Sequence, residues 1–474
     1  MTATEHKAAD NLVYCRDSQG LEVRANLLKV TPFQVVFEAF GPVCVLRASE
    51  VLRDFKILLQ GRPVYFGQAV VTNLIDMGGA LLCEAALQQS WIDQDSVQVA
   101  LGADEVRSGF EKFMQQWQKH YKVTPEYKVI VADMQAYMAD LKVWLDQVEL
   151  RFRSLAGENR LKAEQVAVRE LEQSTTPVLN LLFQKFEETC RNIDPEVAPV
   201  HAAFCRRQLH PLLMASPFMH RIFAKPLGYA GDYEMVNMLL RDSCEGGSLF
   251  GKLLNIFILS QVPAVAHRNR VAYLTRRLME EANRRFQAGR TARVLNFGCG
   301  PAKEVQDFLA QHALCDHAQI ELVDFEDDAL AHVTQVTGDL KSRHRRRTLL
   351  KPIKKSVQQV LRHVGKPVGE SGQYDFVYCA GLFDYLSSRT CRTLVAHFYD
   401  LLAPGGLLVI TNVEDQHPIR NIMEHIYEWR LICRSRKELA GLAPEPAPPD
   451  AVSVQMDSSG GNIFLEVRKP LTAQ

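Results

Sequence analysis

Apolar and polar residues alternate in short runs from Asn11 to about Leu101, and Gly, Pro and Asn separate the runs. This period of two predicts short β-strands that form a small barrel or sandwich, which we place in residues 1–104. From Glu105 the period changes to three or four, as shown by Tyr137, Leu141, Trp144, Leu145 and Val148. That period predicts helices. We divide them into a stalk or linker over 105–160 and a second helical region over 161–285.

The most informative stretch is Thr291 to Leu309, TARVLNFGCGPAKEVQDFL, where a buried strand, a glycine turn and a helix follow one another. Gly298 and Gly300 carry no side chain, so the backbone of the turn can approach a ligand closely. Glu304 falls in the first turn of the helix, where the positive end of the helix dipole favours an acid. Such a unit can hold either a dinucleotide or the methyl donor S-adenosylmethionine.

A second strand, Ile320 to Leu330, ends in acids about two dozen residues after the glycine turn, at the distance where an acid can accept both ribose hydroxyls of an adenosine. Asp324 is the best candidate, with Asp327 next. A third glycine is missing, so the turn fits the dinucleotide fingerprint GxGxxG poorly. It resembles motif I of class I methyltransferases, whose usual acid two positions before the first glycine is here Asn296.

Two further motifs follow in order. The stretch from Tyr374 to Tyr385, YDFVYCAGLFDY, resembles the fourth strand of a methyltransferase sheet, and Gly381 and Asp384 would edge its pocket. The next stretch, LLAPGGLLVITNV, resembles the turn and fifth strand, and two short strands near the C-terminus would complete the sheet. Three ordered motifs predict an α/β Rossmann-like class I methyltransferase domain over 286–474 with S-adenosylmethionine as cofactor.

Two polar segments outside these motifs are candidates for contacting substrate. The corner KPLGYAGDYEM contains Tyr229 and Tyr233, with Asp232 placed to cap a following helix, and we expect it to act as a lid. Residues Asn421 to Glu438 are predicted to form one helix containing Trp429 and Arg430. Class I methyltransferases commonly place substrate-contacting groups after the fifth strand.

Composition narrows the partners and the compartment. Lys plus Arg and Asp plus Glu both total 55, so overall charge gives no reason to expect nucleic acid. The most basic run, Lys341 to Lys355, lacks the interleaved aromatic residues that would stack on bases. We interpret it as an exposed loop and helix start. The alternative is a site that steers an anionic carrier.

Eleven cysteines without a CxxC pair fit reduced thiols rather than disulfides or a metal site. With no signal peptide and no membrane span in the sequence, we expect a cytoplasmic protein without stable membrane insertion.

The N-terminal barrel resembles a PilZ-like domain, a fold that in many bacterial proteins binds cyclic di-GMP. Binders carry an RxxxR arm and a [DN]-x-S-x-x-G loop. Here Asn73 and Gly78 occupy the outer positions of the loop, Ile75 replaces the serine, and no RxxxR precedes the barrel. Because the arm supplies the charge-assisted phosphate contacts, cyclic di-GMP binding is unlikely. The barrel is then expected to serve dimerisation or partner contact, with a homodimer through either the barrel or the helical stalk.

The whole chain resembles bacterial proteins that synthesise 3-hydroxypalmitic acid methyl ester, an extracellular signalling factor in quorum sensing. The motifs that carry this resemblance are KPLGYAGDYEMVNMLL, LNFGCGPAKEV and MEHIYEWRL. It implies a small-molecule or acyl substrate, with a methyl group transferred to a fatty-acid carboxylate. From their position alone, Tyr229 and Tyr233, with Trp429 or Arg430, are predicted to orient the carboxylate. The residues implied for holding the cofactor are Asn296, Gly298, Gly300, Asp324, Phe325, Gly381 and Asp384.

Two alternatives remain open. A methyltransferase acting on a hydroxyl or amine of another small molecule would need a general base, and His210, His220 or Glu424 could serve. The chain could also be a regulatory protein that senses a nucleotide through the barrel and S-adenosylmethionine through a catalytically weak sheet. Asn296 and the degenerate barrel loop keep this second alternative open.

Overall fold

The computed structural model describes residues 11–471 except for 32, 41–44, 60, 78–79, 89–106, 109, 112–113, 116–117, 119–122, 153, 156 and 363–371. The chain forms two compact units. Unit 1 comprises Met1–Ala230, Ser243–Ile258 and Ile419–Arg430, and unit 2 comprises Gly231–Asp242, Leu259–Pro418 and Leu431–Gln474. Each unit is therefore built from separate stretches of the sequence.

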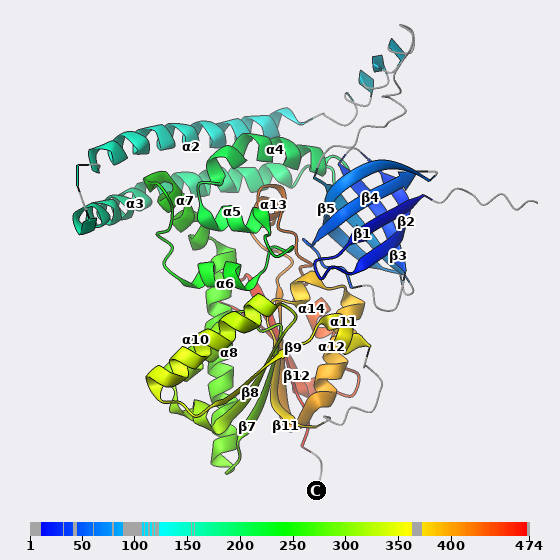
Figure 1. Cartoon of the computed structure of the whole chain (residues 1–474), viewed down its shortest axis with the longest axis vertical. Coiled ribbons are helices and arrows are strands. Elements are labelled where there is room, and N and C mark those ends of the chain that lie inside the picture. The colour runs from blue at the N-terminus through cyan, green and yellow to red at the C-terminus, as the bar shows by residue number, and fades with distance from the viewer. Residues whose placement is uncertain are drawn as a thin grey trace, which may run out of the picture. The chain divides into compact units, whose positions relative to one another are not determined.

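Six antiparallel strands of unit 1 form a closed barrel in the order β1-β2-β3-β6-β5-β4 (Figure 1). Aromatic rings fill its interior, where Phe37 and Phe55 are fully buried with ring centroids 5.9 Å apart. The alternation of apolar and polar residues arises because successive side chains of a strand point to opposite faces. The strands are β1 Leu12–Arg16, β2 Glu22–Val30, β3 Gln34–Phe40, β4 Val51–Leu59, β5 Arg62–Asp76 and β6 Ala80–Leu87.

Helices form the rest of unit 1. The two longest, α2 and α3, run side by side (Figure 1); α2 ends at Phe152 and α3 begins at Gly157. Of the predicted apolar stripe on α2, Leu145 is buried whereas Trp144 is 49% exposed. The helices are α2 Pro125–Phe152, α3 Gly157–Cys190, α4 Ala198–Leu213, α5 Pro217–Ala224, α7 Leu249–Ser260, which ends just beyond the unit, and α13 Arg420–His425.

The short helix α13 belongs to unit 1 although it follows, in sequence, the fifth strand of the C-terminal sheet. The Glu187 carboxylate accepts hydrogen bonds from Asn421 N, Asn421 Nδ2 and Ile422 N at 3.3, 2.8 and 2.7 Å. A carboxylate at a helix N-terminus satisfies backbone amides that have no partner within the helix. At the other end of α13, Tyr127 Oη lies 3.0 Å from His425 Nδ1.

Unit 2 contains a seven-stranded sheet in the order β12-β13-β11-β10-β7-β8-β9. Strands β9, β8, β7, β10 and β11 are parallel, and β13 and β12 continue the sheet antiparallel. The order reverses between β7 and β10, and open parallel sheets bind ligands at the carboxyl end of such a switch point. The strands are β7 Ala292–Phe297, β8 Ala318–Asp324, β9 Leu349–Lys354, β10 Tyr374–Cys379, β11 Leu402–Val413, β12 Val452–Met456 and β13 Asn462–Arg468.

Helices cover both faces of this sheet. Leu274 and Leu278 of α8 and Phe308 of α9 share a buried core with Val294 and Ile320 of the sheet. On the other face, Phe398 of α12 contacts Phe297, with ring centroids 5.2 Å apart. The helices are α6 Tyr233–Leu240, α8 Val262–Gln287, α9 Lys303–Gln311, η2 Ala313–His317, α10 Asp327–His344, α11 Val357–Leu361, η3 Phe383–Tyr385, α12 Ser388–Leu401, α14 Arg436–Ala440 and η4 Pro449–Ala451.

The predicted fold class is confirmed: an N-terminal barrel, a helical middle and a C-terminal α/β sheet. Among the described residues no single helix is long and apolar enough to cross a bilayer, although the bent pair of α7 and α8 passes that test by length and composition alone. Part of the predicted helical stripe, with Phe113, Trp117 and Tyr121, lies outside the described residues.

The prediction of one helix from Asn421 to Glu438 is wrong. Helix α13 ends at His425, α14 begins at Arg436, and the residues between them are not helical. Glu428 has a φ of 53°, in the left-handed region, which a right-handed helix cannot include. Its carboxylate pairs with the buried Lys225, whose own φ is 44°, at an Nζ–Oε2 distance of 3.2 Å.

This ion pair gives a stability prediction. The Glu428 side chain is 13% exposed, and replacing Lys225 with Met removes the nearer of the two cations that pair with it among the described residues, leaving Arg206 at 3.6 Å, so we expect a loss of about 1–3 kcal/mol in the free energy of unfolding. Urea unfolding of the full chain measures it. The control is Lys142→Met, which removes an exposed pair with Asp146 and should cost less than about 0.5 kcal/mol. Equal losses in the two variants would contradict the prediction.

Candidate active site

The glycine turn follows β7 at the switch point of the sheet. Gly300 has a φ of 49° and Gly298 one of 70°, a region that other residues adopt only under strain. Gly298 N and Cys299 N donate to Val323 O at 2.8 and 3.0 Å, which fixes the turn against the end of β8. The turn therefore presents backbone, without side chains, beside the predicted acid.

Asp324 ends β8 and is only 7% exposed. Its Oδ2 accepts from Gly300 N at 2.9 Å, and its Oδ1 accepts from Phe325 N at 2.8 Å and Glu326 N at 3.2 Å. The carboxylate thus connects the glycine turn to the loop after β8, where the predicted residue Phe325 is half-buried. A carboxylate has about four acceptor positions, so it can still take a ribose hydroxyl.

Asn296, the residue that replaces the usual acid of motif I, lies beside an acid from the next helix. Its Nδ2 donates to Glu304 Oε1 at 2.9 Å, and Tyr378 Oη donates to the same oxygen at 2.8 Å. Burial raises the pKa of the Glu304 carboxyl. The buried Oδ1 of Asn296 has no hydrogen-bond partner among the described residues. Glu304 therefore places a carboxyl group beside position 296, an arrangement that the sequence did not reveal.

Arg270 of α8 is the residue of this region that the sequence analysis missed. It is 7% exposed, and a Cβ placed on Gly381 would lie 3.0 Å from its Nη1. The guanidinium makes no hydrogen bond or ion pair with any residue that the structure describes. Burial lowers the pKa of Arg270, and the nearby Asp384 and Glu304 carboxyls oppose that shift. A buried cation is stable only when an anion or acceptor compensates it. The Asp384 and Glu304 carboxyls supply part of that compensation, and an anionic ligand beside Gly381 would add a direct partner.

Asp384, in η3 after β10, has a structural role within unit 2. Its Oδ1 accepts from Val413 N and its carbonyl oxygen accepts from Ile432 N, both at 2.7 Å. These bonds hold the loop that contains Gly381 against β11 and the chain that follows Arg430. Burial raises the pKa of the Asp384 carboxyl to about 6, and Arg270 opposes the shift.

This pKa makes folding stability depend on pH. Between about pH 4 and 6 the unfolded chain has lost the Asp384 proton and the folded chain retains it, so stability falls as pH rises through this range. Asp384→Asn should flatten the dependence, removing a decrease of about 1–3 kcal/mol. Urea unfolding of both proteins at pH 4.5 and 7 tests this, and parallel pH profiles would contradict it.

Among the residues predicted to orient the substrate, Tyr233 is the one that lies in unit 2. It begins α6, which Asp232 caps as predicted, with Oδ1 accepting from Met235 N at 2.7 Å. A Cβ on Gly300 would lie 4.0 Å from Tyr233 Cβ, so the tyrosine is next to the glycine turn. Its ring also contacts the ring of His332, at a centroid distance of 5.2 Å.

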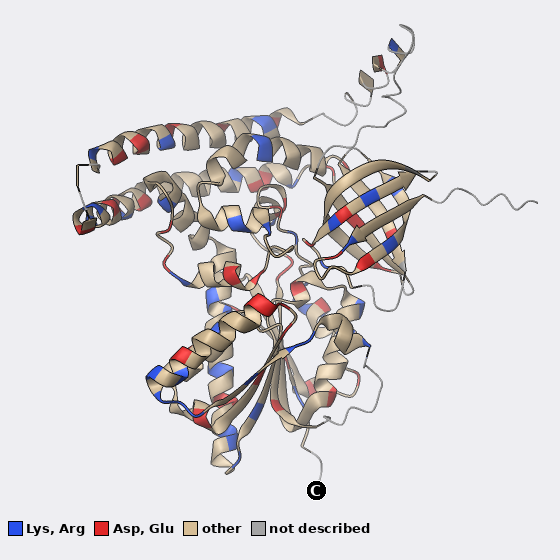
Figure 2. Cartoon of the chain, in the orientation of Figure 1, with Lys and Arg blue, Asp and Glu red and all other residues tan. Residues whose placement is uncertain are grey.

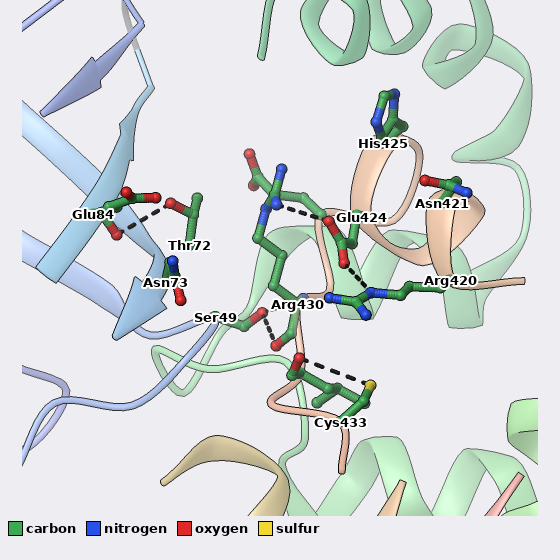
Figure 3. Close-up of polar contacts among 12 residues, drawn as sticks. Ser49, Thr72, Asn73, Glu84, Arg420, Asn421, Glu424, His425, Arg430 and Cys433 are labelled. Atoms are coloured by element: carbon green, nitrogen blue, oxygen red, sulfur yellow. Dashed lines mark hydrogen bonds and ion pairs between the residues drawn. The ribbon is translucent and has the colours of Figure 1, made fainter. Parts of the chain in front are cut away.

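The other three predicted orienting residues lie in unit 1. The Tyr229 ring is 5.8 Å from the Arg47 guanidinium, and Trp429 is 3% exposed. Arg430 pairs its backbone with Ser49 Oγ and donates from Nη1 to Glu424 Oε2 at 2.8 Å (Figure 3). Their part in substrate binding stays a prediction.

Two of the three candidate bases, His210 and Glu424, are already engaged in unit 1. His210 Nε2 lies 2.8 Å from Ile426 O, and burial lowers the pKa of His210. Glu424 bridges Arg420 and Arg430, accepting at 2.8 Å from each (Figure 3). His220 is exposed on the surface of α5.

The residues of unit 2 therefore form a site at the carboxyl ends of β7, β8 and β10. It combines a bare backbone turn, carboxylates at Asp324 and Glu304, and a buried cation at Arg270. A ligand that fits has a diol or similar donor near Asp324 and an anionic group near Gly381. S-adenosylmethionine meets both requirements through its ribose and its methionine carboxylate, and its ammonium group complements the acids.

Comparison with known proteins identifies the class of domain in unit 2. Residues 295–408 match the family described as a methyltransferase domain. The prediction of a methyltransferase domain is confirmed, and S-adenosylmethionine is the donor that goes with this class of Rossmann-like enzyme. No curated protein matches the sequence.

Three solved structures are similar in part. A possible exported protein from Bordetella parapertussis is 16% identical with a TM-score of 0.42, covering 66% of this chain and 99% of that one. Magnesium protoporphyrin IX methyltransferase from Synechocystis PCC 6803, with bound S-adenosylhomocysteine, is 13% identical with a TM-score of 0.33, covering 45% and 87%. The N-methyltransferase NodS from Bradyrhizobium japonicum is 16% identical with a TM-score of 0.30, covering 50% and 98%.

Proposed function

We propose that the protein transfers the methyl group of S-adenosylmethionine to the carboxylate of a 3-hydroxy fatty acid, giving a methyl ester. The observation that carries the donor assignment is Arg270, a buried guanidinium beside Gly381 that makes no direct hydrogen bond or ion pair with the described residues, at the switch point of a methyltransferase sheet. The acceptor assignment is supported by the resemblance of the sequence motifs to proteins that synthesise a hydroxy fatty acid methyl ester.

In this proposal each residue of unit 2 has a separate part in holding the donor. Arg270 pairs with the methionine carboxylate, and Glu304, with Asn296, faces the ammonium group. Asp324 accepts from the ribose hydroxyls, and the Gly298–Gly300 turn passes beneath the methionine chain. Phe325 covers the adenosine, and Asp384 keeps the Gly381 loop in position through its bond to Val413 N.

The chemical step needs positioning more than proton transfer. A carboxylate oxygen attacks the methyl carbon, the carbon–sulfur bond breaks, and its electron pair stays on sulfur, leaving neutral S-adenosylhomocysteine and the ester. No proton moves, so no general base is required. Rate enhancement would come from placing oxygen, carbon and sulfur in line and excluding water from the donor. Tyr233, beside the glycine turn, would orient the acceptor, and Tyr229, Trp429 and Arg430 remain the other predicted orienting residues.

The test is transfer from S-adenosylmethionine labelled in its methyl group to 3-hydroxypalmitic acid by the purified full chain. A methyl ester releases labelled methanol on mild alkaline hydrolysis, whereas a methyl ether or methylamine does not. The matched acceptor is the corresponding 1,3-diol, which keeps the hydroxyl and lacks the carboxylate. We expect alkali-labile label with the acid and none with the diol. Label on the diol, or alkali-stable label, would overturn the carboxylate assignment.

A second candidate is methylation of a hydroxyl or amine on another small molecule. His332 favours it, because its ring contacts Tyr233, and its Nε2 lies 3.2 Å from the Asn237 amide. It joins His210, His220 and Glu424 as a candidate base. If a base is needed, His332→Gln should lower kcat about a hundredfold or more, whereas a carboxylate acceptor should tolerate the change. Donor binding without turnover on any acceptor would instead favour a sensing role.

For the barrel we propose partner contact or dimerisation without cyclic di-GMP. Asn73 is exposed on β5, and Ile75, in place of the serine of binders, is 43% exposed. An aliphatic side chain offers no hydrogen bond to a phosphate or base. Calorimetry with cyclic di-GMP tests this directly, and heat of binding at micromolar ligand would contradict it.

A further inference from the structure

Three apolar side chains are exposed at one end of the sheet in unit 2. Phe286 is 46% exposed at the end of α8, just before β7, and Leu349 is 61% exposed as the first residue of β9. Leu471 is 76% exposed and lies against Gly405, near the start of β11. These are the exposed large apolar residues of unit 2 within the described part of the chain. All three lie at the amino ends of parallel strands, opposite the end that carries the glycine turn.

Basic side chains lie at the same end. Arg290, Arg343, Arg345 and Arg347 are exposed and make no ion pair with any residue that the structure describes. Two contacts connect Arg347 with Phe286, because the Phe286 ring lies 4.3 Å from the His317 ring and neighbouring Asp316 accepts from Arg347 N. Figure 2 shows basic residues near the ends of α8 and α10. We call Phe286, Arg290, Arg343, Arg345, Arg347, Leu349 and Leu471 the basic-apolar surface.

Several acids of this end are engaged by other groups. Glu321 pairs with Lys351 at 3.1 Å, and Glu281 pairs with Arg284 and Arg468 at 2.7 and 2.6 Å. Asp375 pairs with Arg285. The arginines of the surface therefore keep their positive charge available for a partner.

We propose that the basic-apolar surface docks unit 2 on an anionic phospholipid bilayer. Arginines that bind phosphate and flank exposed phenylalanine and leucine side chains form the combination that stabilises proteins at a lipid headgroup boundary. Nucleic acid fits less well, because single-stranded binding uses several aromatic rings for stacking. The surface lies opposite the glycine turn within unit 2, so docking would leave the donor site uncovered.

The inference extends the proposed function, since a fatty-acid substrate partitions into bilayers, but its test is independent of catalysis. Co-sedimentation of the full chain is measured with vesicles of phosphatidylcholine alone and of phosphatidylcholine with about one third phosphatidylglycerol, without donor or acceptor. We expect binding to the anionic vesicles only, weakened about tenfold or more when salt is raised from low to high concentration.

One variant that combines four substitutions, Arg343→Gln, Arg345→Asn, Arg347→Gln and Leu349→Ser, tests the surface. We expect its vesicle partition coefficient to be about tenfold or more below that of the unaltered chain. Asn suits Arg345 because its φ is 54°. The matched control carries four substitutions at exposed positions of α2 and α3, namely Arg151→Gln, Arg169→Gln, Lys185→Gln and Val166→Ser. It should bind the anionic vesicles as the unaltered chain does. The proposal would be overturned by equal binding of the unaltered chain to both vesicle types, or by equal effects of the two sets of substitutions on vesicle binding. Displacement of the protein from vesicles by duplex DNA would also overturn it. Transfer to a soluble short-chain acid by the quadruple variant separates a docking defect from a failure of catalysis.

Discussion

Replacing Arg270 with Met is expected to weaken binding of S-adenosylhomocysteine roughly a hundred- to a thousandfold, because it removes a buried charge-assisted contact and leaves the ligand carboxylate uncompensated. Met keeps most of the side-chain length and apolar contact. Isothermal titration calorimetry of the full chain measures the change. Thermal unfolding of the same samples shows whether the fold has been kept.

The control for this prediction is a second ligand. 5′-Methylthioadenosine has the adenosine and sulfur of the donor product but lacks the amino-acid end, so Arg270→Met should change its affinity by less than about threefold. Arg270→Lys, which keeps the charge and loses the bidentate geometry, should give an intermediate loss for S-adenosylhomocysteine. If both ligands lose affinity equally, Arg270 supports the fold. If neither does, the carboxylate is held elsewhere.

The second large effect is expected at Asp324. Ala at this position removes the proposed acceptor for the ribose and the observed acceptor for Gly300 N, Phe325 N and Glu326 N, so donor affinity should fall about a hundredfold or more. Both ligands, S-adenosylhomocysteine and 5′-methylthioadenosine, should lose affinity, because both contain the ribose. This pattern differs from the one expected for Arg270→Met.

Asp327 offers the matched control for Asp324→Ala. Its carboxylate is 75% exposed and pairs with Lys354, so Asp327→Ala should leave donor affinity within about threefold of the unaltered chain. A large loss at Asp327 with little loss at Asp324 would mean that the ribose is held by the first turn of α10. Asp324→Asn keeps one acceptor oxygen, so its loss of donor affinity should lie between the losses of Asp324→Ala and Asp327→Ala.

Local sequence was sufficient to predict the elements of the donor site. The strand β7, the turn at Gly298 and Gly300 and the acid at Asp324 are set by apolar runs and by backbone conformation, both of which short stretches encode. The barrel was predictable for the same reason, since its alternation follows directly from the pleat of each strand.

Residues that act through distant contacts were not predictable. Position 270 falls on the buried stripe of α8 with Ala266, Leu274 and Leu278, each four residues apart, and an arginine on such a stripe was the available signal. The helix predicted after the fifth strand failed because tertiary contacts override local propensity. Glu428 is held left-handed by Lys225, and Ile432 N bonds to Asp384 O.

The central claim, methylation of a hydroxy fatty acid on its carboxylate, is tested most directly by mass spectrometry of lipids. Extracts are compared from cells that express the intact protein and from cells that express the Asp324→Ala variant at the same level. A 3-hydroxy fatty acid methyl ester should appear with the intact protein and be absent with the variant. Equal amounts in the two extracts, or no ester from cells whose purified protein binds the donor, would contradict the account.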